Sequence, residues 1–132
     1  MPPVDSEFPY DFGFVPSTLA DGGDPVDVLV LMDEPAFPAC LLKCRVVGII
    51  EGVQGNGKDK QRNDRIIAIE KDNHSYTYIK QVRDLGKKLV QELEECFVNY
   101  HEHLGKKLRV LDVKGSSEAC RRIADGMRAN RC

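Results

Sequence analysis

Three runs of β-branched and aliphatic residues constrain the fold of this chain more than any other feature. They occupy residues 26–32 (VDVLVLM), 41–51 (LLKCRVVGIIE) and 65–70 (RIIAIE). Turn-forming residues bound the first run, and a polar, glycine-bearing stretch at residues 52–63 connects the second to the third. This pattern is typical of short strands, and the connection is typical of a hairpin. The sequence therefore predicts three strands in its first half.

The spacing of apolar residues changes after the third run. Asp84 suits an N-cap, and the 3–4 spacing that follows it is that of an amphipathic helix. Its apolar positions are Leu85, Leu89, Val90, Leu93, Cys96, Phe97 and Tyr100. Gly105 is expected to end this helix, residues 107–114 alternate as a strand, and one of two serines caps a final helix over residues 116–130. This order predicts a mainly β domain, a small barrel or curved sheet, with two helices packed on it.

Composition favours one soluble domain. The 132 residues are 42% hydrophobic and 30% charged, and no apolar run approaches the roughly 20 residues of a membrane span. No signal peptide is visible, and the five cysteines lack zinc-finger spacing. We therefore expect a single cytoplasmic domain over residues 1–132, with reduced thiols and no membrane association.

Charge is divided unevenly along the chain. Residues 1–42 hold eight carboxylates and no Lys or Arg, whereas residues 43–132 hold thirteen carboxylates and all nineteen Lys and Arg. An acidic front and a basic back suit a site that binds metal cations together with phosphate oxygens. Chance asymmetry of a solvated surface is the other explanation.

The stretch Asp24-Pro25-Val26-Asp27, preceded by two glycines, carries the clearest chemical signal. Two carboxylates at the entrance of a strand can converge on a divalent cation, and the glycines and Pro25 provide the tight turn that presents them. Oxygen ligands with room for water suit Mg²⁺, with Mn²⁺ as an alternative. Taken alone, the pattern is also that of an ordinary Asx turn.

The wider context is more specific. Residues 8–40 (FPYDFGFVPSTLADGGDPVDVLVLMDEPAFPAC), 62–70 (RNDRIIAIE) and 97–107 (FVNYHEHLGKK) resemble the soluble family I inorganic pyrophosphatases, in the family's order. The resemblance implies an OB-like β-barrel, here partial, with two flanking helices. It also implies a cytoplasmic, Mg²⁺-dependent enzyme that hydrolyses pyrophosphate to two phosphates and forms a homo-oligomer.

The resemblance also assigns roles to individual residues. It implies that Asp27 is a metal ligand and that Asp24 both binds metal and helps deprotonate the attacking water. Arg65 falls at the family's phosphate-binding lysine, while Tyr100 and Lys106 match the pair that holds the leaving phosphate. Two plainer explanations stay open: Tyr100 as a core residue, and Lys106 as a solvated cation at a helix end.

Several positions depart from the family pattern. Gly22 stands where the family has the first aspartate of D-G-D-P-x-D. In the hairpin, counting without gaps places Lys58 and Asn63 on two further metal-binding aspartates. A slip of one residue would instead bring Asp59 or Asp64 into play, so Asp64 is a third candidate metal ligand. In addition, a phenylalanine (Phe12) replaces a tyrosine and a histidine (His101) replaces a lysine.

The front of the chain is shorter than in the family. Eleven residues precede Phe12, whereas family members carry a longer segment whose strands bring a lysine, an arginine and glutamates to the active site. We expect either a naturally short variant or a fragment of a longer sequence. Because missing strands would expose the edge of the strand at residues 41–51, a second copy of the chain is expected to cover it.

Three functions are compatible with these observations. The first is a pyrophosphatase weakened by the missing ligands, and the second is an inactive relative with a binding or assembly role. The third, oligonucleotide binding on an OB-like barrel, is disfavoured because the chain has no Trp, a net charge of −2 and no basic-aromatic interleaving. The expected partners are therefore pyrophosphate, phosphate and a second copy of the chain.

Overall fold

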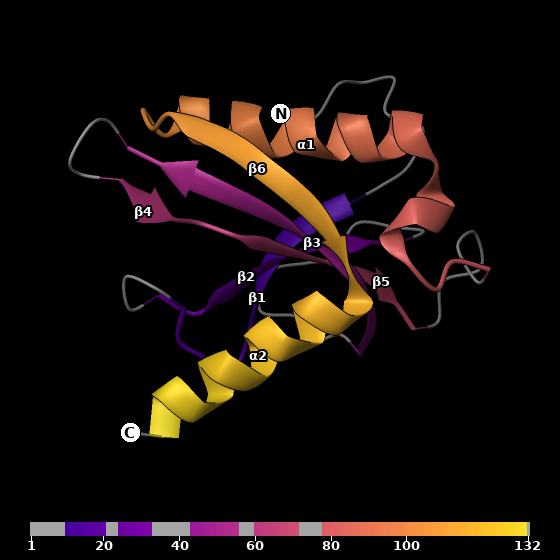
Figure 1. Cartoon of the computed structure of the whole chain (residues 1–132), viewed down its shortest axis with the longest axis horizontal. Helices are drawn as coiled ribbons and strands as arrows, with labels where there is room; N and C mark the ends of the chain where they lie inside the picture. The colour runs from indigo at the N-terminus through magenta and orange to yellow at the C-terminus, as the bar shows by residue number, and fades with distance from the viewer. Residues whose placement is uncertain (1–9, 21–23, 33–42, 56–59, 72–77, 132) are drawn as a thin grey trace.

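The computed structural model describes residues 10–20, 24–32, 43–55, 60–71 and 78–131. Its six strands are β1 (Tyr10–Val15), β2 (Val26–Leu31), β3 (Cys44–Gln54), β4 (Gln61–Arg62), β5 (Arg65–Glu70) and β6 (Leu108–Gly115). The helices are a short 3₁₀ helix, η2 (Val82–Leu85), followed by α1 (Lys87–His103) and α2 (Ser116–Arg131). All three predicted strands, both predicted helices and the strand between the helices are present (Figure 1).

The strands form one mixed sheet in the order β1-β2-β5-β3-β4, and β6 also pairs with β3. β2 and β5 are parallel, and the other pairs are antiparallel. The register of β3 shifts between Val46 and Gly48 and again between Glu51 and Gly52. Because such irregularities bend a strand and increase its twist, they account for the curled, half-barrel shape of the sheet.

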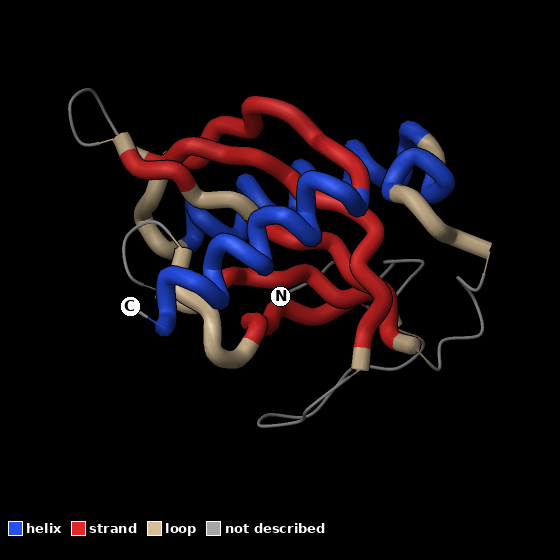
Figure 2. The backbone as a smooth tube through the Cα atoms, turned by 60° about the horizontal axis from the view of Figure 1, so that its bottom comes forward, coloured by secondary structure: helices blue, strands red, loops and turns tan. Residues whose placement is uncertain are grey.

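The sheet is buried on both faces, which explains why its strands are nearly continuous apolar runs. On β2, Leu29 and Leu31 belong to a core that includes Leu93 and Phe97 of α1. The alternate residues pack into a second core that includes Ala119 of α2; on β2 they are Val26, Val28 and Val30. The two helices therefore cover opposite faces, and Figure 2 shows α2 crossing one of them.

Two local predictions need correction. Asp84 is not the N-cap of the long helix; it lies in η2, where its carboxylate accepts hydrogen bonds from the backbone N–H groups of Lys80 and Gln81. The N-cap of α1 is Gly86, whose positive φ of 89° turns the chain between the two helices. Gly105, with φ of 76°, lies just beyond the C-terminus of α1, as predicted.

The expectation of a bare edge on the second predicted strand is wrong. β3 pairs with β5 and β4 along one edge and with β6 along the other, so it lies inside the sheet. A strand was also missed: residues 10–15, for which the sequence predicted no strand, form β1 and pair with β2. Within the described part of the chain, no helix is long and apolar enough to cross a membrane.

Candidate active site

A cavity of about 770 Å³ lies where β2 and β5 begin. We call it the β2–β5 cavity. The predicted site residues that line it are Asp24, Asp27, Asp64, Arg65, Tyr100 and Lys106. These side chains come from the turn before β2, from β2 itself, from the start of β5 and the residue before it, and from α1 and the turn that follows it. The structure thus brings all six together from three distant parts of the sequence.

Asp27 and Arg65 are brought together by the register of the sheet. They are direct partners in the parallel pairing of β2 with β5, so their side chains lie on the same face. Nη2 of Arg65 lies 3.6 Å from Oδ2 of Asp27. The Asp27 side chain is 38% exposed, whereas that of Arg65 is 5% exposed. Asp27 is therefore accessible from the cavity, and Arg65 supports it from within the fold.

Three aromatic rings surround the Arg65 guanidinium. Its Cζ lies 4.8 Å from the ring centroid of Phe12, 4.9 Å from that of Phe97 and 5.7 Å from that of Tyr100. Phe12 and Tyr100 are stacked, with centroids 4.5 Å apart and an angle of 24° between their planes. These cation–π contacts compensate in part for the burial of the charge. No described residue accepts a hydrogen bond from Nε of Arg65, so its hydrogen-bonding capacity is incompletely used.

Burial dominates the electrostatics of this pair. It raises the pKa of Asp27; the positive charge of Arg65 acts in the opposite direction, and the negative charge of Asp24 adds to the rise. The positive charge of Lys106 also lowers the pKa of Asp27. Burial likewise lowers the pKa of Arg65, although Asp27 opposes this. A further cation near Asp24 and Asp27 would stabilise the ionised carboxylates.

The hydrogen bonds of His101 are those of a neutral imidazole ring. Its Nδ1 lies 3.0 Å from the backbone oxygen of Phe97, and its Nε2 lies 2.8 Å from Nδ2 of Asn63. A proton on Nδ1 satisfies the carbonyl and leaves Nε2 to accept from the amide, which also donates to Gln54. Burial lowers the pKa of His101, which favours the same form. At the position where the family has a lysine, this chain therefore has an uncharged ring.

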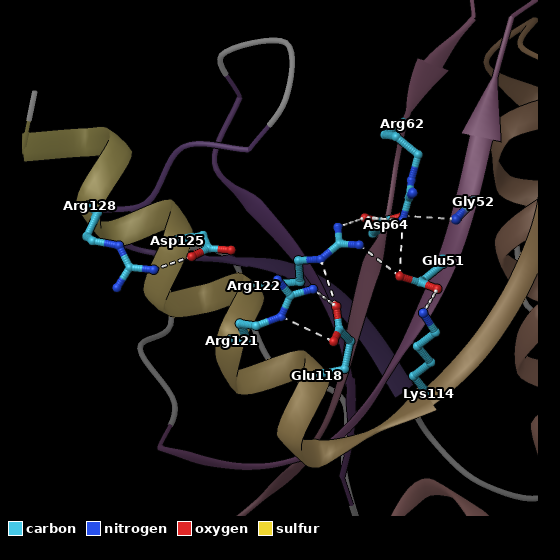
Figure 3. Close-up of polar contacts among 10 residues, drawn as sticks. All are labelled: Glu51, Gly52, Arg62, Asp64, Lys114, Glu118, Arg121, Arg122, Asp125 and Arg128. Atoms are coloured by element: carbon cyan, nitrogen blue, oxygen red, sulfur yellow. Dashed lines mark hydrogen bonds and ion pairs between the residues drawn. The ribbon is translucent and has the colours of Figure 1, made fainter.

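Asp64 is held by two arginines. Its carboxylate accepts hydrogen bonds from Arg62, at 3.1 Å and 3.2 Å from Nη2, and from Nη1 of Arg122. The backbone N–H of Gly52 donates to it as well, at 3.0 Å. Figure 3 shows the two guanidinium groups reaching Asp64 from β4 and from α2. The metal-binding role expected for Asp64 stays a prediction, and it would require at least one arginine to move.

Glu51 completes this ion network and was not anticipated from the sequence. It is 5% exposed, and its carboxylate pairs with Arg62 at 3.1 Å, Arg122 at 2.8 Å and Lys114 at 3.0 Å. Nε of Arg122 pairs in turn with Glu118 at 3.2 Å. One signal was available: Glu51 is the single carboxylate in a long apolar run, and a buried carboxylate requires cations around it.

The donor set suits a metal ion that arrives with a phosphate ligand. Among the described residues, no group of three or more His, Cys, Asp or Glu could hold a metal. Mg²⁺ commonly binds proteins through one or two carboxylates and completes its shell with water and substrate phosphates. Asp24 and Asp27 fit this mode. Three positions that bear on the question, Gly22, Lys58 and Asp59, lie outside the described residues.

A curled sheet flanked by two helices, with carboxylates and cations around one cavity, is an OB-like architecture suited to phosphate chemistry. A family model described as inorganic pyrophosphatase matches residues 3–131. This chain belongs to the inorganic pyrophosphatase family.

Relatives and solved structures agree with this assignment. An inorganic pyrophosphatase of Synechocystis is 39% identical over 102 residues, which are 77% of this chain and 57% of the relative. Soluble inorganic pyrophosphatase 3 of Arabidopsis thaliana is 36% identical over 112 residues, 85% of this chain and 50% of the relative. This chain thus spans between half and three-fifths of their length. The solved structure of the Thermus thermophilus enzyme has a TM-score of 0.81 at 26% identity, covering 92% of this chain and 70% of that one. For the Helicobacter pylori enzyme the TM-score is 0.79 at 28% identity, with coverages of 92% and 71%.

Proposed function

We propose that this chain catalyses the Mg²⁺-dependent hydrolysis of inorganic pyrophosphate to two phosphates, more slowly than a full-length relative. The observation that carries the proposal is the β2–β5 cavity, in which Asp24, Asp27, Arg65, Tyr100 and Lys106 meet. Carboxylates beside fixed cations are what the hydrolysis of a polyanion requires, because the substrate's own charge repels a nucleophile.

In this mechanism Asp24 and Asp27 would hold Mg²⁺ together with the substrate. When bound, the ion would neutralise phosphate oxygens and lower the pKa of a water molecule. Asp24 accepts a proton from the attacking water. The oxygen of this water forms a bond to phosphorus, and the bridging P–O bond breaks. Lys106 and the Tyr100 hydroxyl donate hydrogen bonds to the departing phosphate, which leaves with the bridging oxygen. Arg65, nearly buried, keeps Asp27 in place.

The reduced rate follows from the ligands. Gly22 and Asn63 replace two carboxylates of the family pattern, and His101 replaces a cation. Each 1.4 kcal/mol of lost transition-state stabilisation costs about tenfold in rate, so two or three missing ligands cost orders of magnitude. Metal affinity should fall as well, because Mg²⁺ affinity depends on the number of charged ligands.

The test is phosphate release from Mg²⁺-pyrophosphate by the purified chain. Asp27→Asn should abolish release, whereas Asp112→Asn, which removes an exposed carboxylate on β6 outside the cavity, should leave it unchanged. Gly22→Asp should raise the rate. Wild-type turnover within threefold of a full-length relative under the same conditions would contradict the proposed weakening, and release that persists in Asp27→Asn would contradict the assigned site.

A second function, pyrophosphate binding without turnover, is favoured by the pairing of Asp64 with Arg62 and Arg122. These ion pairs keep a third carboxylate from a metal. The two functions differ in one experiment: an inactive binder retains affinity for a non-hydrolysable analogue such as imidodiphosphate but releases no phosphate. The cytoplasmic location and the homo-oligomer implied by the family resemblance stay predictions, and light scattering tests the second.

A further inference from the structure

We propose that Arg62 binds a phosphate group of the substrate and that Asp64, together with Glu51, holds its guanidinium in position for this. The inference deepens the proposed function and rests on it. It gives Asp64 a role that does not depend on a metal ion, namely to anchor a cation at the rim of the β2–β5 cavity.

Two carboxylates hold the guanidinium of Arg62. Its Nε lies 3.2 Å from Oδ1 of Asp64, and its Nη2 lies 3.1 Å and 3.2 Å from the two Asp64 oxygens. The same Nη2 lies 3.1 Å from Oε2 of Glu51. A guanidinium held along one edge by two carboxylates has already lost its rotational freedom. A ligand that binds to its other edge therefore does not bear the cost of ordering the side chain.

Arg62 keeps hydrogen-bond donors that the described residues do not use. A guanidinium has five N–H groups, and the contacts of Arg62 use those of Nε and Nη2. Within the described parts of the chain, nothing accepts a hydrogen bond from its Nη1. The side chain is 35% exposed and lines the β2–β5 cavity. Phosphate oxygens are well matched to such donors, because charge-assisted hydrogen bonds from arginine are short and strong.

Arg122 serves as the internal comparison. It lines the same cavity, yet its Nη1 donates to Asp64, its Nη2 to Glu51 and its Nε to Glu118. All three nitrogens are thus engaged within the fold, and its side chain is 26% exposed. Arg122 is therefore a clamp between α2 and the sheet, whereas Arg62 is anchored and still has donors to offer.

The charge of the whole network favours an anion. Its carboxylates carry three negative charges and its cations four positive ones; the members are Glu51, Asp64, Glu118, Arg62, Lys114, Arg121 and Arg122. Asp64 and Glu51 also raise the pKa of Arg62 against the effect of burial, so its charge is permanent. A polyanion that enters the cavity, which Arg62 lines together with Arg65 and Lys106, thus meets a fixed positive group.

Calorimetric titration with imidodiphosphate in the presence of Mg²⁺ tests the inference. Arg62→Gln should weaken binding about tenfold or more, as expected for a lost charge-assisted hydrogen bond. Arg109→Gln removes an equal charge from an exposed position on β6 outside the cavity and should change affinity less than about twofold. Asp64→Asn should also weaken binding, because it loosens the anchor while Arg62 is kept.

A second measurement is independent of how well the variants fold. In the wild-type protein, the side-chain Nε–H resonance of Arg62, assigned by its loss in Arg62→Lys, should shift when imidodiphosphate is added. Unchanged affinity in Arg62→Gln, or a resonance that does not respond to a ligand that binds, would overturn the inference and leave the proposed function intact. A wild-type chain that binds no imidodiphosphate at all would overturn both.

Discussion

Replacing Arg65 with methionine should abolish the proposed pyrophosphate hydrolysis with little change in stability. In most proteins the loss of a buried charged residue is strongly destabilising, because its partner is left unpaired in a dry environment. Here the partner, Asp27, keeps a side chain that is 38% exposed and can be hydrated from the cavity. The Arg65→Met substitution thus separates what the guanidinium does for the fold from what it does for the site.

The expected change in the free energy of unfolding on Arg65→Met is the balance of opposing contributions. The contacts of Arg65 with three rings and with Asp27 are worth about 2–4 kcal/mol together, since a single desolvated cation–π contact contributes up to about 2. Against this, an Nε without an acceptor costs about 1–3 kcal/mol. Methionine fills much of the same space, and its sulfur–aromatic contacts return about 0.3–1.5 kcal/mol. We therefore expect a free energy of unfolding within about 1.5 kcal/mol of wild type.

Urea denaturation followed by circular dichroism measures this directly; the chain has no Trp to serve as a fluorescent probe. Arg65→Ala is the matched control, because it removes the same charge but leaves a cavity between the rings. This cavity should lower the free energy of unfolding by about 2 kcal/mol more. Phosphate release should be lost in both variants. A loss of more than about 3 kcal/mol in Arg65→Met would refute the reasoning, since it would make Arg65 chiefly a structural residue.

Two further predictions concern stability. Because burial lowers the pKa of His101 below its ordinary 6.5, the unfolded chain binds the proton first as the pH falls. The free energy of unfolding should therefore decrease below about pH 6.5, by at most about 1.4 kcal/mol per pH unit from this group. Urea titrations at several pH values should show that the free energy of unfolding depends less steeply on pH in His101→Gln than in the wild type. A Cβ on Gly48 would lie 2.7 Å from both the backbone oxygen of Lys114 and Cβ of Val82, so Gly48→Ala should cost about 1–3 kcal/mol, whereas Gly13→Ala, with its nearest contact at 3.5 Å, should be close to neutral in the same assay.

The main elements were predictable because the local and long-range requirements agree. Apolar runs bounded by turns became β2, β3 and β5, and the 3–4 spacing before Gly105 became α1. β1 was missed because its six residues, YDFGFV, contain a glycine and an aspartate and lie among turn-forming residues. It is a strand because β2 pairs with it along its whole length, and such long-range pairing leaves a weak local signal.

The residues of the candidate site could be predicted where they belong to a recognisable sequence motif. Residues that come together only in the folded chain could not be predicted. Asp24, Asp27, Arg65, Tyr100 and Lys106 were all assigned from the sequence, and all line one cavity. The ion network around Glu51 was not predicted from the sequence, because its members come from β3, β4, β6 and α2 and have no common spacing. Glu51 and Arg122, for example, are 71 positions apart and meet at 2.8 Å.

The hairpin before β5 shows why counting residues could not decide between Asn63 and Asp64. Successive side chains in an extended segment point to opposite faces of a sheet, so a shift of one residue exchanges the faces. Asn63 contacts His101 on the face that also carries Asp27 and Arg65, whereas Asp64 contacts Arg122 on the face covered by α2. The side chain that this hairpin offers to the Asp27 face is therefore an amide, and its carboxylate is directed to arginines. This orientation links the expected loss of metal affinity to the proposed gain of an anchored phosphate-binding arginine.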